Sequence, residues 1–111
     1  MDFDRFKAYG RSAEALGQSA VESDTLIRRM GFEANARADY AASNDRTRAM
    51  LDAYAQGVNA FIESTASPAI EYRLLDLNPE PWQPFDCLAV ARIRHVFMGN
   101  FEFKLWRAKL L

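Results

Sequence analysis

Histidine and cysteine are almost absent from this sequence, which has one of each among its 111 residues. A single cysteine excludes a disulfide within the chain, and so few ligands exclude the His-rich and Cys-rich patterns of zinc sites. The chain also lacks a glycine-rich phosphate loop and a G-x-S-x-G nucleophile elbow. Cys87 would need a nearby base to act as a nucleophile, and His95 lies about two helical turns further on. We therefore expect Cys87 to be a small apolar side chain, and we expect no catalytic residue in this chain.

Long runs of like charge and long uninterrupted apolar runs are also missing. There are 14 basic and 15 acidic residues, and the net charge is −1. The longest apolar stretch, residues 85–103, is interrupted by Asp86, Arg92, Arg94 and Glu102. These patterns argue against a nucleic-acid partner and against a membrane span. The first residues also lack the charged, apolar and small-residue order of a signal peptide.

Helical patterns fill most of the chain, and half of the residues are hydrophobic. Helix formers, caps and terminal glycines predict five helices and no strand. The expected fold class is therefore all-α, and residues 1–111 are expected to form one unit. In the last helix, Gly99 and Asn100 predict a bend. Four of the five expected helices cover residues 2–16, 22–32, 32–43 and 85–110, and the remaining one begins at Asn44 or Asp45 and includes residues 51–62.

The most regular pattern follows Asn44 and Asp45, either of which can cap a helix. Apolar residues then recur at steps of three and four, which predicts one continuous apolar stripe. Gly57 lies inside this helix at a cost of about 1 kcal/mol, so we expect a close-packed neighbour there. The stripe consists of Leu51, Tyr54, Ala55, Val58, Phe61 and Ile62.

All four prolines lie in residues 66–84, which predicts a loop, with a short extended stretch at residues 72–77. Pro84 suits the first turn of a helix because its missing N–H would have no partner there. Trp82 stands between prolines and is expected to anchor the loop in apolar packing.

Four segments, in this order, resemble the α-subunit region of the penicillin acylase family, which belongs to the N-terminal nucleophile (Ntn) hydrolases. "GRSAEALG" is similar to G-R-L-A-E-x-L-G, and "SDTLIRRMGF" to D-x-x-x-R-x-x-G. "DAYAQGVNAFIE" is similar to A-Y-A-x-G-V-N-A-[FWY]-I, and "PEPWQPFDCLA" to P-x-x-W-x-P-x-D. The last two segments are the more specific, and the resemblance covers nearly the whole chain.

The resemblance implies a helical lobe of an αββα hydrolase that cleaves linear amides or acyl-amides, meaning C–N bonds other than peptide bonds. Substrates of that family include penicillins, cephalosporin side chains such as glutaryl, and N-acyl homoserine lactones. A precursor, or zymogen, cleaves itself, and the new N-terminal serine of a β subunit is the nucleophile. The implied partners are that β subunit and a small acyl-amide, with no organic cofactor. The resemblance also suggests a periplasmic or secreted enzyme, and we expect this partial α region to be inactive alone.

The same resemblance implies that the helix after the W-x-P-x-D motif lines the acyl pocket. Counting from Asp86, the matching positions are His95 and Met98, with Phe97 and Phe101 as near alternatives. Each has a plainer interpretation, because a lone histidine is often a surface residue and Met or Phe is often core. Glu102 is the nearby candidate for a structural Ca²⁺, since calcium prefers oxygen ligands.

A different interpretation stays open from the helical pattern alone. The apolar stripes suit a stand-alone helical module that binds a partner protein without catalysis. The enzyme hypothesis requires a self-cleavage junction with a serine further along the gene product, whereas the module requires only that these residues fold by themselves.

Overall fold

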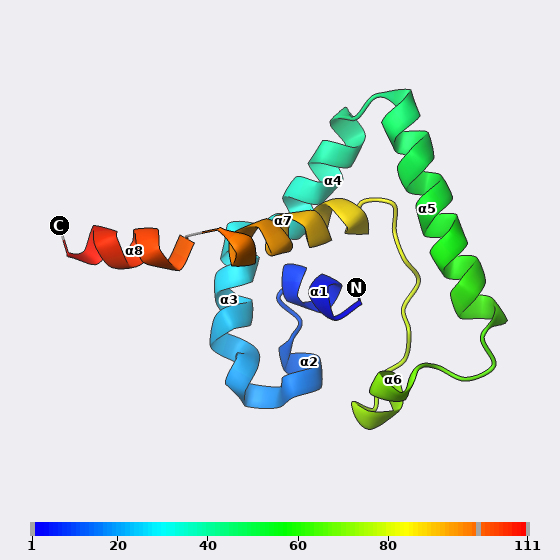
Figure 1. Ribbon diagram of the computed structural model, residues 1–111, viewed down its shortest axis with the longest axis horizontal. Helices are drawn as coiled ribbons and strands as arrows, with labels where there is room; N and C mark the ends of the chain where they lie inside the picture. The colour runs from blue at the N-terminus through cyan, green and yellow to red at the C-terminus, as the bar shows by residue number, and fades with distance from the viewer. Residues whose placement is uncertain (1, 100, 111) are drawn as a thin grey trace.

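The chain is all α-helical, as the sequence predicts. The computed structural model describes residues 2–99 and 101–110, apart from the side chains of residues 101–103, and this part contains no strand. None of its helices is both long enough and apolar enough to cross a membrane. The elements, labelled as in Figure 1, are α1 (Asp2–Ala8), α2 (Ala13–Leu16), the 3₁₀ helix η1 (Gly17–Ala20), α3 (Val21–Met30), α4 (Phe32–Ala42), α5 (Asp45–Ser64), α6 (Ile70–Leu74), α7 (Asp86–Met98) and α8 (Phe101–Lys109).

Helix α7 runs through the middle of the molecule and packs against α1 and α4, while α1 also contacts α3 (Figure 1). The helices pack closely because small side chains lie at their contacts. These are Ala8, Ala36 and Ala89, each at most 1% exposed. Ile93 is fully buried among them. This main core consists of Ala8, Ile27, Phe32, Ala36, Phe85, Ala89 and Ile93.

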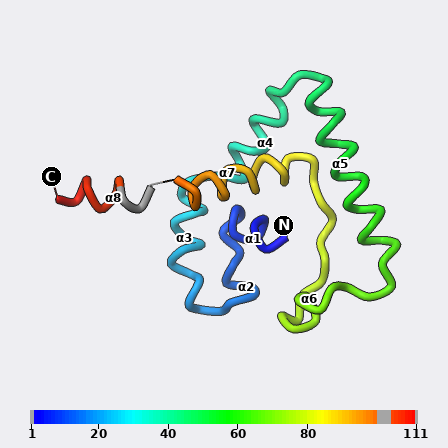
Figure 2. Tube along the Cα trace, viewed as in Figure 1, coloured from blue at the N-terminus to red at the C-terminus, as the bar shows by residue number. Residues whose placement is uncertain are grey.

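Helix α5 stands to one side of this core, and Figure 2 shows the chain leaving its end, passing α6 and returning to α7. A second, smaller core joins α5 to that returning segment and to α7, and it consists of Ala55, Trp82 and Val90. Trp82 is 4% exposed, so the prediction that it anchors the proline loop is confirmed.

The apolar stripe of α5 is buried only in part. Leu51 and Ala55 are buried, whereas Tyr54 and Phe61 are 42% and 70% exposed. The close neighbour expected at Gly57 is absent from the described residues, since an added Cβ would meet no atom within 4 Å. The cap is confirmed, because the Asn44 side chain accepts a hydrogen bond from the backbone N–H of Thr47.

The expectation of one helix over residues 2–16 is wrong. Gly10 has φ +61°, and a Cβ there would lie 2.6 Å from the carbonyl oxygen of Asp24, so the chain turns where only glycine fits. The Asp24 carboxylate then accepts hydrogen bonds from the backbone N–H groups of Ser12 and Ala13, at 3.0 and 2.7 Å. Asp24, which lies in the first turn of α3, therefore supports the start of α2.

The C-terminal third follows the predicted order with one change. Residues 70–74 form the short helix α6, so the expected extended stretch at residues 72–77 is not formed. The predicted bend is confirmed, because α7 ends at Met98 with Gly99 in an extended conformation and α8 begins at Phe101. In Figure 1, α8 extends away from the other helices.

Candidate functional site

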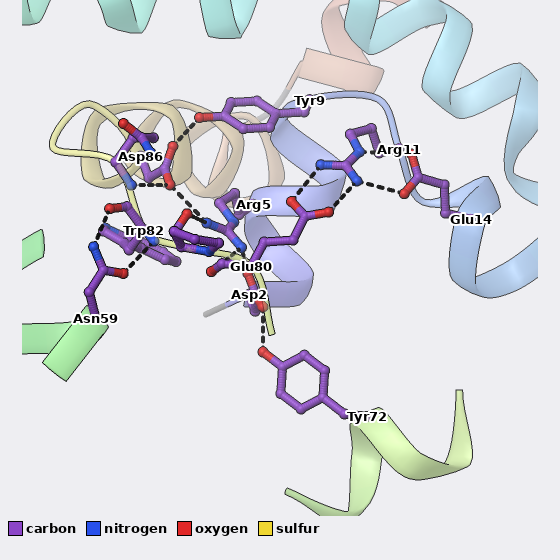
Figure 3. A network of polar contacts seen from close by, with 12 residues as sticks. Asp2, Arg5, Tyr9, Arg11, Glu14, Asn59, Tyr72, Glu80, Trp82 and Asp86 are labelled. Atoms are coloured by element: carbon purple, nitrogen blue, oxygen red, sulfur yellow. Dashed lines mark hydrogen bonds and ion pairs between the residues drawn. The ribbon is translucent and has the colours of Figure 1, made fainter. Parts of the chain in front are cut away.

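A buried arginine of α1 connects the start of the molecule with the proline loop and with α7. Arg5 is 3% exposed, and its guanidinium donates to the Asp86 carboxylate at 3.0 Å and to the carbonyl oxygens of Pro81 and Glu80 at 2.9 and 3.2 Å (Figure 3). The same group forms an ion pair with Asp2 at 2.6 Å. A buried charge is tolerated when it is paired and hydrogen-bonded, and Arg5 is both.

Asp86 receives three donors and thereby fixes the start of α7. Besides Arg5, the backbone N–H of Gln83 donates to it at 2.8 Å, and the Tyr9 hydroxyl donates to its second oxygen. Burial raises the pKa of Tyr9, and the bond to Asp86 raises it further. A carboxylate in the first turn also suits the positive end of the helix dipole. Helix α7 therefore begins at a fixed place and with a fixed rotation relative to α1.

Trp82 is held from the other side by the amide of Asn59 in α5. The Asn59 side chain donates to the carbonyl oxygen of Trp82 at 2.9 Å, and the backbone N–H of Trp82 donates to the Asn59 amide oxygen at 2.6 Å (Figure 3). The Arg5 guanidinium lies 4.9 Å from the indole centroid, and Tyr54 meets that ring edge-to-face. The two more specific sequence segments, around residues 59 and 82, are thus in direct contact.

Arg11 provides a further tie between the first turn of the chain and the proline loop. Its guanidinium binds both carboxylate oxygens of Glu80, at 2.8 and 2.7 Å, and both of Glu14, at 2.7 Å. Hydrogen bonding to Arg11 lowers the pKa of each glutamate. Planar pairing of this kind is the geometry that arginine makes well.

The far end of α7 carries three of the predicted pocket residues, and all three side chains are exposed. Phe97 and Met98 are 57% and 88% exposed, and His95 is exposed as well. At 3.6 residues per turn, His95 and Met98 share one face, whereas Phe97 is turned by about 160° from His95. Phe97 lies against α1, since the Lys7 amino nitrogen is 4.3 Å from its ring centroid. Among the described side chains, these three residues present an open surface.

The remaining predicted residues, Phe101 and Glu102, belong to α8, and their side chains are outside the described part of the structure. Within that part, no three histidine, cysteine, aspartate or glutamate side chains are grouped so that they could hold a metal ion. The calcium prediction therefore has no support from the described side chains, and no step below uses calcium.

A cavity of about 650 Å³ lies elsewhere, between α5, α6 and the proline loop. Aromatic side chains of Tyr54, Phe61, Tyr72 and Trp82 line much of it, and none of the three predicted pocket residues whose side chains are described contributes to it. Tyr72 donates to Asp2, another lining residue. The cavity is thus a separate feature, and the resemblance gives it no role.

Cys87 behaves as the sequence suggests. The side chain is half-buried, and burial raises the pKa of its thiol, which outweighs a lowering contact from Trp82. A raised pKa disfavours the thiolate that a nucleophile needs.

Sequence reasoning missed Arg5, Asn59 and Lys7. Arg5 directly precedes Phe6, and a charged residue beside a core position was a usable signal. Asn59 lies in the middle of "GVNAF", where a polar residue flanked by apolar ones indicates a buried hydrogen bond. Lys7 gave no signal, because only the packing of α1 on α7 brings it to Phe97.

Comparison with known proteins agrees with the four sequence segments. The family model described as Penicillin amidase matches residues 1–111. The chain is 49% identical over 107 residues to Penicillin acylase 2 proenzyme of Pseudomonas sp. (strain SE83), covering 96% of this chain and 14% of that protein. It is 37% identical over 84 residues to acyl-homoserine lactone acylase QuiP of Pseudomonas syringae pv. tomato, covering 74% of this chain and 10% of the relative. It is 33% identical over 106 residues to Penicillin G acylase of Escherichia coli, covering 90% and 12%.

Proposed function

This chain belongs to the penicillin amidase family, and we propose that it forms part of a hydrolase that cleaves linear amides or acyl-amides. The proposal is supported by the names of the relatives, which are penicillin acylases and acyl-homoserine lactone acylases. The chain spans only between 10% and 14% of the length of these three relatives, so the activity is proposed for a longer protein.

The proposed mechanism places the nucleophile outside this chain. A precursor cleaves itself, and the serine that becomes the N-terminus of the β subunit attacks the amide carbon through its hydroxyl oxygen. The serine's own α-amino group takes the hydroxyl proton and returns it to the departing amine, so the C–N bond breaks as an ester forms. Hydrogen-bond donors of the β subunit stabilise the negative oxygen of the tetrahedral intermediate. Water then hydrolyses the ester and releases the acid.

The role proposed for this chain is to hold part of the acyl group at the end of α7. One observation carries it: α7 is anchored firmly at its start, by Arg5 and Asp86, yet its last turn leaves large side chains exposed. An anchored helix presents such side chains at defined positions, which suits a binding surface. Met98 would offer an adaptable apolar contact, and His95 would donate a hydrogen bond to a polar acyl tail.

The test uses the complete, self-processed enzyme with His95→Ala and Met98→Ala. We expect both variants to change the ratio of kcat/KM values between long and short acyl chains while the precursor still cleaves into two subunits on a denaturing gel. Met50→Ala is the matched control, because Met50 is 64% exposed on α5 and far along the chain from α7. Unchanged acyl preference in both variants would remove these residues from the site. Phe97 and Phe101 are proposed as secondary contacts, and Glu102 as a calcium ligand, on the resemblance alone.

The proposed partner is the β subunit of the same precursor, in line with the proenzyme that the chain resembles. A periplasmic or secreted location is part of the same proposal, and fractionation of cells that express the complete gene tests it. Recovery of the processed enzyme only in the cytoplasm would contradict the location.

A stand-alone helical module that binds a partner protein is the second candidate function. The exposed apolar side chains suit such a module as well as they suit a β-subunit contact. Phe61, Leu74 and Met98 are between 70% and 88% exposed, which suits contact with another protein as well as with a β subunit. The adjoining coding sequence distinguishes the acylase from the interaction module. Absence of a serine-bearing self-cleavage junction within a few hundred codons would leave only the module.

A further inference from the structure

Helix α5 forms one edge of the molecule (Figure 1), and it is apolar on two sides. Ala55 points inward and is 3% exposed. On the outward side Ala53, Gly57 and Ala60 are exposed, and Phe61 at the edge of this side is 70% exposed. These four outward positions lie within about 100° of one another around the helix. A helix that is apolar all round is typical of the interior of a larger protein.

The charged side chains of α5 avoid the outward side. Within residues 49–64 the charged residues are Asp52 and Glu63, and both lie more than about 100° around the helix from Gly57. The centres of protein interfaces are depleted in charge. The outward side of α5 therefore fits an apolar partner and offers a strongly charged one nothing to pair with.

Gly57 lies in the middle of this outward side. Glycine is a poor helix former, and an added Cβ at this position would meet no atom within 4 Å, so no described neighbour requires its small size. Glycine does allow another backbone to approach a helix closely. Ala53 and Ala60 lie about one turn before and after it and keep the same strip shallow. The strip is thus shaped for close contact with a segment outside the described chain.

The cavity of about 650 Å³ opens beside this strip. Phe61 contributes to its lining although the residue stays 70% exposed, so the strip and the cavity share this side chain. The two carboxylates among the lining residues, Asp2 and Glu80, are bound by Arg5 and Arg11 at 2.6 and 2.7 Å. The cavity therefore offers mainly apolar and aromatic surface, which suits large apolar side chains of a partner.

The length of protein outside this chain indicates what covers the strip and the cavity. The chain spans only 10% to 14% of three relatives, and one of them is a proenzyme. Protein interiors are close-packed, so an apolar strip beside a cavity of this size is filled by other parts of a complete protein.

We propose that the outward side of α5 and the cavity beside it form one interface with the β subunit of the same precursor. An apolar segment of that subunit packs with its backbone on Gly57 and with large side chains in the cavity. The inference rests on the proposed function, since it assumes the self-cleavage that creates the β subunit. It adds a subunit contact on α5 to the acyl contact proposed at the end of α7.

The experiment places the photo-crosslinking amino acid p-benzoylphenylalanine in the complete precursor in place of Phe61. After self-cleavage and irradiation, a denaturing gel should show a new band at the summed mass of the two subunits. Mass spectrometry of that band should find a β-subunit peptide attached to position 61. Gln56 is the matched control, because it is also exposed on α5. It lies about 140° around the helix from Phe61, so the same probe at position 56 should give about 10-fold less of this product.

Bulk at Gly57 gives a second measurement on the processed enzyme. Gly57→Leu should lower the urea concentration at which the two subunits separate on size exclusion by about 1 M, because the new side chain takes the place of the partner's backbone. Gln56→Leu adds the same side chain one residue away and should leave that concentration unchanged. If Gly57→Leu does not self-cleave, the crosslink at position 61 still decides, because that variant keeps an aromatic side chain at its site.

The outcomes separate this interface from the proposed activity. The interface would be overturned if the probe at position 61 attached only within its own subunit, only to a second copy of that subunit, or to nothing. If that enzyme still self-cleaved and hydrolysed acyl-amides, the proposed function would stand. Equal effects of Gly57→Leu and Gln56→Leu would overturn the close approach at Gly57. A parent precursor that never self-cleaves would overturn the proposed function and this inference with it.

Discussion

The bond between Arg5 and Asp86 allows a quantitative prediction for Asp86→Ala. Asp86 is 1% exposed and accepts from Arg5, Tyr9 and the backbone of Gln83. Removing one partner of a buried ion pair costs about 3–5 kcal/mol, because the other charge is left unpaired. Arg5 keeps Asp2 at 2.6 Å, so we expect the lower end, about 3 kcal/mol. That is a large share of the total stability of a domain of this size, which is about 5–15 kcal/mol.

The assay is urea unfolding of the 111-residue chain, followed by circular dichroism and by tryptophan emission. With a denaturant slope of about 1.5 kcal/mol per molar, a loss of about 3 kcal/mol moves the midpoint down by about 2 M. Trp82 reports locally, because Arg5 covers its ring. Asp45→Ala is the control: Asp45 also pairs with an arginine, at 2.5 Å, but its side chain is 97% exposed, and its midpoint should move far less.

A double variant tests the reasoning directly. Replacing both charges with apolar residues of similar size, Arg5→Met with Asp86→Leu, should restore part of the lost stability, since neither member of the buried pair is left without the other and Asp2 keeps the Tyr72 hydroxyl. The two single losses should therefore sum to more than the double loss by about 2 kcal/mol. Strict additivity, or an Asp86→Ala midpoint close to that of Asp45→Ala, would show that the pair is not the element that fixes α7.

Three further predictions concern stability. Asn59→Ala should cost about 2–3 kcal/mol in the same urea assay, because two hydrogen bonds to the backbone of Trp82 are lost together; a loss below about 0.5 kcal/mol would contradict that contact. Gly10→Ala should destabilise the fold strongly, because φ of Gly10 is +61° and the new Cβ would overlap its neighbours. Gly57→Ala should instead stabilise the fold by up to about 1 kcal/mol, because a Cβ there meets open space on α5. Thermal midpoints that move in the same direction in both variants would contradict this. Arg11 lowers the pKa of Glu14 and Glu80 below the usual 4.5. The stabilisation from these two ion pairs is therefore complete above pH 4.5 and is lost as the pH falls through the lower pKa of the folded state. Arg11→Gln should flatten the decline of the urea midpoint below pH 4.5, and an unchanged decline would contradict the assignment.

The helices could be predicted where local chemistry decides them. The Asn44 cap, the apolar spacing in α5 and the Gly99 break are properties of neighbouring residues, and the structure confirms them. The break at Gly10 was missed because it depends on a distant residue: Asp24 takes over the N–H groups that a continuous helix would have used. Which part of an apolar stripe is buried also depends on distant packing, as Phe61 shows with 70% exposure.

The candidate site was predictable only in part for the same reason. The motif around Trp82 indicated where α7 begins, and the family resemblance, counted from Asp86, pointed to His95 and Met98, which stay a prediction. Lys7 reaches Phe97 from another helix, about ninety residues earlier, and no spacing rule links the two. Residues that share a helix can be placed by periodicity, whereas residues that meet across helices need the fold.

The Asn59 contact has a consequence for how this protein tolerates changes in length. Asn59 bonds to the N–H and C=O of position 82, so it recognises a place along the backbone and not the indole itself. The segment between Trp82 and Asp86 cannot change its length freely, because the Asp86 carboxylate also accepts a hydrogen bond from the backbone N–H of Gln83. One inserted residue there would rotate α7 by about 100° and carry Phe97 away from Lys7. One inserted residue in the turn at 65–69 would be absorbed before position 82, so insertions and deletions should be accepted there and rejected at 83–85.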